Sequence, residues 1–447
     1  MGFVRAAGSA VKMLKNIGAR GIVLASVPLI LIRAVPSWAA PTIEGSLETG
    51  GYVYSPQQYG FAGTGTEYRI YENVAFDAAF NDNWSFHFDS RAGYQSQKRE
   101  APDHWILNLY YSYLEYRSDS FGFQFGRIMD FNNLIYLYFD GCLLTNTITI
   151  SGSKLILDLY GGVIVKDDYL KEYRNDLSFR TFSSVDYRNI FIKQRVGDYV
   201  AGTKVTLVAE KAGIFGLDYQ LVLNNNAMAE HYASVNFETA FSTKFKLYGY
   251  GTLDLVRVLP SGTLVGMQID PVESFSLVIS HEYYRPVFLK NSYFWSYFEP
   301  YGNQEASATL LFIVSKPLTV DVKYGAIIYD SASEVGNEIA LGLEHRNINK
   351  FGIKVNAELI VGPEGNLITL QAMMKRRVSI LNLLAGGGVE FYNDDVITSG
   401  LSTGYFATLG ADIEIIKSLI LSASGEYSGN QRSRYDIRGT VSLKYIF

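Results

Sequence analysis

The sequence predicts an all-β protein, namely a transmembrane antiparallel β-barrel of about 22 strands, within a range of about 18 to 22, and no plug domain. Three observations carry this prediction. Apolar and polar residues alternate at period 2 through most of the chain, which is typical of strands between lipid and water. Tyrosine (33), phenylalanine (27) and glycine (41) are abundant, whereas proline (11) is scarce. After residue 39, no apolar run reaches the ~18 residues of a membrane-spanning helix. A large soluble β-solenoid or sandwich is the alternative fold.

Residues 1–39 have the organisation of a secretory signal peptide. Basic residues as far as Arg20 precede an apolar core at 22–32, which is too short to span a bilayer as a helix. Ser37 and Ala39 then provide the small residues that a signal peptidase reads, so we expect cleavage after Ala39. Translation starts at Met1 or Met13. Residues 40–447 form the barrel domain.

The predicted strands begin almost directly after the cleavage site. The clearest patterns lie at 43–53, 68–80, 84–94, 154–165, 351–361 and 405–415. In 154–165, for example, Leu155, Leu157 and Leu159 alternate with Lys154 and Asp158. We expect the apolar set to face lipid and the polar set to face the lumen.

The connections between strands alternate in length. Ten short polar turns are predicted near 81–83, 118–119, 151–153, 211–212, 242–243, 271–273, 316–317, 347–350, 377–379 and 417–418. Eleven generally longer links are predicted at 55–66, 96–104, 129–140, 166–194, 224–228, 258–260, 285–303, 330–334, 362–365, 393–401 and 429–436. Short periplasmic turns and longer outer loops are the usual asymmetry of membrane barrels, and an even strand number leaves both termini in the periplasm.

The last strand ends the chain on an aromatic residue. Val441, Leu443, Tyr445 and Phe447 form one apolar face of 438–447. A bare apolar edge invites pairing with other chains unless it closes a barrel. This ending resembles the assembly signal of Gram-negative outer-membrane barrels. The resemblance implies an outer-membrane location and two partners, the outer-membrane lipid and the barrel-assembly machinery.

A second resemblance covers about twenty residues. The run 121–127 ends in Gly126-Arg127 and leads through a loop to Phe139-Asp140-Gly141. This is similar to the arrangement around an early loop in porin-type channels, including alginate-export-type barrels. Arg127 shares the parity of the apolar Phe125, however, and would face away from the pore unless a bulge turned it.

The longest link contains the candidate pore constriction. The segment 166–195, which is this link with the residue after it, is rich in aromatic residues and carries the basic residues Arg174, Arg180, Arg188 and Arg195. A loop of this length is commonly functional or disordered. One interpretation folds it into the lumen, where the arginines would narrow the pore and attract anions. The other interpretation packs it outside as a lid. The aromatic link 285–303 leaves a similar choice between an outer girdle and an inward plug or binding platform.

The sequence contains no pattern that predicts catalysis, a cofactor or a metal site. The five histidines are scattered, and both Asp103-His104 and His281-Glu282 are better explained as rim or lumen groups than as acid–base pairs. Cys142 is the only cysteine, which excludes an internal disulfide and a haem-attachment motif. We therefore predict no catalytic residue, no cofactor, no metal and no nucleic-acid partner.

Two functions remain open. The first is a porin-like channel for the passive passage of small polar or anionic solutes. The second is the sheath of a porin–cytochrome electron conduit, whose barrel subunit the chain resembles because it is wide and plugless and has no haem motif of its own. A multihaem cytochrome is the partner in that interpretation.

Overall fold

A computed structural model describes residues 41–58, 66–95, 105–131, 136–165, 198–210, 212–224, 227–284, 303–329, 335–348, 350–362, 365–393, 401–430 and 433–447. The predicted signal peptide and most of the outer links lie outside these ranges. Within the described ranges, the structure contains no helix with the length and apolarity that crossing a membrane requires.

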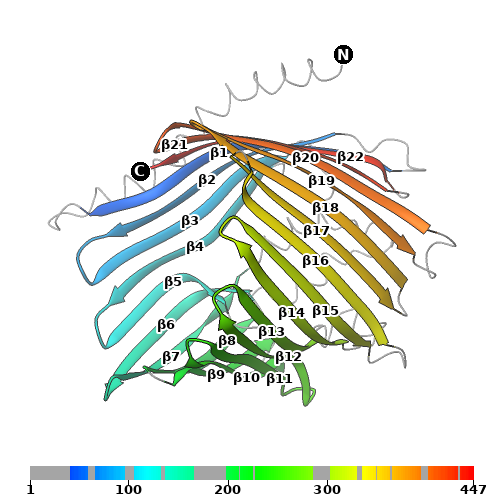
Figure 1. Cartoon of the computed structure of the whole chain (residues 1–447). Coiled ribbons are helices and arrows are strands. Elements are labelled where there is room, and N and C mark those ends of the chain that lie inside the picture. Colours follow the sequence, from blue (N-terminus) through cyan, green and yellow to red (C-terminus); the bar gives the residue numbers. More distant parts are fainter. Residues whose placement is uncertain are drawn as a thin grey trace.

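The described residues form a single closed wall of antiparallel strands (Figure 1). The strands are β1 (Thr42–Gln58), β2 (Glu67–Ala79), β3 (Trp84–Gln95), β4 (Trp105–Arg117), β5 (Phe121–Phe131), β6 (Tyr136–Ile150), β7 (Ser153–Ile164), β8 (Tyr199–Ala209), β9 (Gly213–Asn224), β10 (Ala227–Ser242), β11 (Phe245–Asp254), β12 (Leu259–Val272), β13 (Phe275–Tyr284), β14 (Asn303–Ser315), β15 (Leu318–Tyr329), β16 (Val335–Ile348), β17 (Phe351–Gly362), β18 (Gly365–Val378), β19 (Leu381–Asn393), β20 (Leu401–Ile416), β21 (Leu419–Gly429) and β22 (Ser433–Ile446). This 22-stranded barrel confirms the predicted fold class.

The wall closes where the last strand pairs with the first. β22 runs antiparallel to β1 from Ser46↔Ile446 to Gln58↔Ser433. The terminal residue takes part, since Phe447 and Gly45 exchange two backbone hydrogen bonds of 2.9 and 3.0 Å. In Figure 1 the red β22 accordingly lies beside the blue β1. No described strand is left with an open edge.

The connections follow the predicted alternation, and several boundaries are shifted by a few residues. β5 extends to Phe131 and β6 begins at Tyr136, so the two strands take up most of the predicted link 129–140. Asp140 therefore lies in the wall rather than in a loop. The link between β11 and β12 is a turn at 255–258, because Leu259 and Pro260 already pair with β11.

We predict that removing Phe447 impairs assembly, because the deletion removes two closing hydrogen bonds and a lipid-facing ring at the end of β22. The folded, heat-modifiable fraction in the outer membrane should fall, whereas Phe447→Tyr, which keeps the ring and the backbone, should assemble normally. Equal yields of the deletion and the wild type would show that the terminal strand is no assembly signal.

Candidate functional site

The two faces of the wall follow from the register. Residues opposite one another in antiparallel strands point to the same side of the sheet. Leu409, Val355 and Leu157 lie on the exterior, and Leu409 is 68% exposed to the surroundings. Asp412 and Lys354 lie on the opposite, lumen side. The predicted facing of these strands is confirmed.

The lumen wall carries more carboxylates than cationic groups. On β9 to β17, the lumen-facing acidic residues include Asp218, Glu230, Glu238, Asp254, Glu282, Glu305, Asp321, Glu338, Glu344 and Glu358, and the basic ones are Lys246, Lys323, Arg346 and Lys354. Lys323 bridges two of the carboxylates, with its Nζ 2.7 Å from Glu305 Oε1 and 2.9 Å from Glu338 Oε2. This part of the wall is thus net negative.

Arginine and tyrosine side chains alternate across the lumen face of β22, β1, β2 and β3. Each guanidinium lies over a tyrosine ring, at 5.0 to 5.9 Å from its centroid, within the range of cation–π attraction. The pairs are Arg69 with Tyr52, Arg91 with Tyr71, and Arg438 with Tyr54. These contacts hold the arginines next to tyrosines of neighbouring strands, so the three side chains line the lumen wall.

A histidine lies between two carboxylates near the periplasmic end of the lumen. His87 Nδ1 contacts Asp77, while its Nε2 lies 3.1 Å from Glu115 Oε2 and 2.9 Å from Ser85 Oγ. The order Ser85, His87, Asp77 is that of a hydrolytic triad. A carboxylate lies at each ring nitrogen, however, so the imidazole is held from both sides and Ser85 is not its only partner at Nε2.

The same network joins four strands. Glu115 on β4 also accepts hydrogen bonds from Arg117 Nη2 at 2.8 Å and from Gln124 Nε2 of β5 at 3.1 Å, and the His87 ring stacks on Tyr113 with centroids 4.7 Å apart. We interpret the network as a structural clamp on β2 to β5. Sequence reasoning did not find it, because only the Ser85/His87 spacing is visible before the register is known.

The other candidate acid–base pairs do not form within the described residues. His281 lies on the exterior and Glu282 faces the lumen, because successive residues of β13 point to opposite sides. Asp103 and His104 lie outside the described ranges. Among the described residues, no group of three or more His, Cys, Asp or Glu is arranged to hold a metal ion.

The Gly-Arg and Phe-Asp-Gly elements are cross-strand partners. Arg127 pairs with Asp140 and Gly126 with Gly141. On the exterior, Arg127 Nε and Nη2 donate to the two oxygens of Asp140 at 2.8 and 2.9 Å. Gly126 has a φ of 133°, and a Cβ there would lie 2.3 Å from Ser112 O. The parity argument about Arg127 is therefore correct, since this residue faces away from the pore.

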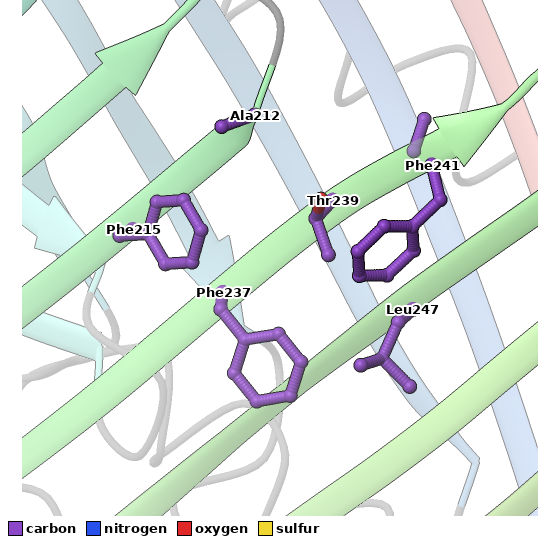
Figure 2. Close-up of a pocket in the computed structure, with 7 residues that line it drawn as sticks. Ala212, Phe215, Phe237, Thr239, Phe241 and Leu247 are labelled. Carbon is purple, nitrogen blue, oxygen red and sulfur yellow. The ribbon is translucent and has the colours of Figure 1, made fainter.

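Aromatic residues mark the periplasmic rim of the exterior. Figure 2 shows Phe215, Phe237, Phe241 and Leu247 around a shallow depression on β9, β10 and β11. Phe215, Phe237 and Leu247 lie on the outward-facing register of their strands, and Phe241 is exposed near the end of β10. The depression therefore faces the membrane and is not a solute site.

The predicted constriction is not among the described residues. Arg174, Arg180, Arg188 and Arg195 all lie in the range 166–197, and most of the aromatic link 285–303 is likewise outside the described part of the chain. Their roles stay predictions. Val441, Leu443, Tyr445 and Phe447 are described, and they form the exterior face of the closing strand, as the pattern predicts.

The comparisons with known proteins show similarity in fold and not in sequence. No family model and no curated protein matches the sequence. Among solved structures, a mutant of the ferric enterobactin receptor of Pseudomonas aeruginosa in complex with enterobactin is similar at 10% identity with a TM-score of 0.59, covering 92% of this chain and 82% of that chain. Another mutant of the same receptor gives 11% identity and a TM-score of 0.58, covering 92% and 81%. OpdQ of P. aeruginosa gives 10% identity and a TM-score of 0.44, covering 91% and 97%.

These findings define the class of protein. A closed 22-stranded antiparallel barrel with an apolar exterior and a polar lumen, similar in fold to the ferric enterobactin receptor, has the architecture of an outer-membrane β-barrel. The chain is accordingly located in the outer membrane.

A pair of neighbouring substitutions tests the facing. Leu409→Arg places a charge in lipid near the middle of β20 and should lower the free energy of unfolding by about 2–4 kcal/mol. Thr408→Arg, at nearly the same depth but facing the lumen, should change it far less. Urea titrations of the barrel in lipid vesicles, followed by tryptophan fluorescence, measure both. Equal destabilisation would mean that the assigned faces are wrong.

Proposed function

We propose that this barrel is a passive channel for small polar solutes and that it catalyses no reaction. The observation that carries the proposal is the polar, charged lumen face of a closed wall whose exterior is apolar. Such a wall encloses water and isolates it from the lipid. All described elements belong to the wall, so none of them occupies the lumen.

A lumen of this width requires a plug or an inward-folded segment that narrows it. Barrels of 22 strands generally hold a plug, because an open lumen of that size would leak. We propose that the segment 166–197 narrows this one from inside. The support comes from an apolar patch on the lumen face of β5 to β9, all of whose members are buried: Ile128, Phe139, Tyr160, Ile164, Val200 and Val222.

The position of the patch favours that segment. Apolar side chains on a lumen wall require a protein cover rather than water. Ile164 ends β7 and Val200 is near the start of β8, so the link between these strands leaves and re-enters the wall at the patch. The segment contains Phe179, Phe182 and Phe191, which are apolar enough to pack there.

The sign of selectivity should be decided at the narrowest point. Charges on a wide aqueous wall are screened over a Debye length of ~8 Å at physiological salt. Charges in a narrow, partly dehydrated passage act more strongly. Arginines at the constriction, Arg174, Arg180, Arg188 and Arg195 among them, would therefore favour anions despite the acidic wall.

We predict that Arg→Glu changes at Arg174, Arg180 and Arg188 shift the zero-current potential in a KCl gradient towards cation preference. Glu305→Gln and Glu338→Gln, on the wide wall, serve as matched controls and should shift it far less. Deleting 172–186 should raise the single-channel conductance. If the wall variants dominate and the arginine variants leave the potential unchanged, the segment is not the constriction.

The alternative is a sheath around a multihaem cytochrome. The width of the barrel favours this alternative, because none of the described elements fills the lumen. The channel proposal has to explain the same feature. Purification from native membranes distinguishes the two proposals, because a haem protein that remains bound through detergent extraction would support the sheath. A barrel recovered without haem, and conducting ions, would support the channel.

A further inference from the structure

We propose that the exterior surface around Arg127 and Asp140, on β4 to β7, is the contact between two copies of this chain in the membrane. The two barrels would be related by a two-fold axis along the membrane normal. Each copy would place its Arg127 opposite the Asp140 of the other.

This ion pair lies within the apolar exterior. Phe125 (61% exposed) and Met129 are the outward neighbours of Arg127 along β5, and Leu144 follows Asp140 along β6. Leu107, 69% exposed, lies towards the outer end of β4. The charges are therefore flanked by lipid-facing side chains on both sides along the strands.

Charged groups are unfavourable on a lipid-facing wall. An arginine at the bilayer midplane of a barrel costs about 2–4 kcal/mol, and ionisable residues at membrane depth generally face other protein. A contact within the chain explains in part why an arginine occupies this position. The β4–β5 ladder ends at Ser112↔Arg127, and Arg127 Nη1 donates to the carbonyl of Leu109, 3.3 Å away, beyond that end.

The carboxylate neutralises this guanidinium, because both oxygens of Asp140 accept from Arg127. Asp140 holds two guanidinium nitrogens, yet its side chain remains 50% exposed. An exposed carboxylate repels the phosphates of lipid headgroups, so an anionic lipid is a poor partner for this surface. A partner that brings a second guanidinium would add to the pairing of this exposed carboxylate.

A second copy brings that group with the correct geometry. Arg127 and Asp140 are register partners on neighbouring strands, so the pair forms a dipole across the wall. Rotation about an axis along the membrane normal keeps each group at its own depth and sets the two dipoles antiparallel. Such an isologous contact pairs each arginine with the carboxylate of the other copy.

The neighbouring residues allow close approach. Ser112 lies opposite Arg127 on β4, while Cys142 and its register partner Gly161 follow on β6 and β7. Small residues at these exterior positions let two walls meet, as they do between packed helices in membranes.

The natural cysteine provides the test. Cys142 is free and partly exposed on the outward register of β6, next to Asp140. A short bismaleimide added to native outer membranes should crosslink the wild-type chain into a dimer of twice the mass. Cys142→Ser should abolish the product, and Cys142→Ser with Val355→Cys, on the exterior of distant β17, should not restore it.

Charge variants separate this contact from chance collision. Asp140→Arg should reduce the crosslinked fraction at least tenfold, because two arginines then face two arginines. Exchanging the charges, with Arg127→Asp and Asp140→Arg together, keeps the cross-pairing and should restore the dimer. Heat-modifiability confirms that each variant is folded. The proposal is overturned if the wild type stays monomeric, if it crosslinks to another protein instead, or if folded Asp140→Arg crosslinks as well as the wild type.

Discussion

Closure of the backbone hydrogen-bond ladder is the constraint on which the rest of this structure depends. In lipid, no water is present to satisfy an open strand edge, so a β-sheet can exist there only as a complete barrel. Here the constraint is met by the pairing of β22 with β1 and by the exchange of hydrogen bonds between Phe447 and Gly45. With the edge closed, one face of every strand meets lipid and the other meets the lumen.

Much of this fold could be predicted from the sequence because a strand repeats every two residues. The alternation of Leu155, Leu157 and Leu159 predicts their face without any knowledge of the neighbouring strands. The short polar turns between such runs predict the number of strands. Parity also predicted that Arg127 faces outward, which the register confirms. Boundaries were less predictable, because the ladder beyond Met129 depends on pairing with Tyr136 and not on the local pattern.

The side-chain networks between strands were less accessible to prediction from the sequence. Asp77, His87 and Glu115 meet only because β2, β3 and β4 pair in one particular register. Arg127 and Asp140 are separated by a link, and their ion pair likewise appears only when β5 and β6 are aligned. The predicted constriction arginines belong to a segment outside the described wall, so the apolar lumen patch at its ends, not the arginines themselves, is what supports their proposed place.

The proposed channel function has one direct physical consequence, which is that ions cross the membrane through the lumen. The measurement that tests this is the conductance of the purified wild-type barrel in a planar lipid bilayer. The account predicts discrete, ohmic current steps from folded, heat-modifiable protein. Folded protein that inserts and conducts nothing would contradict the account and would mean that the lumen is filled.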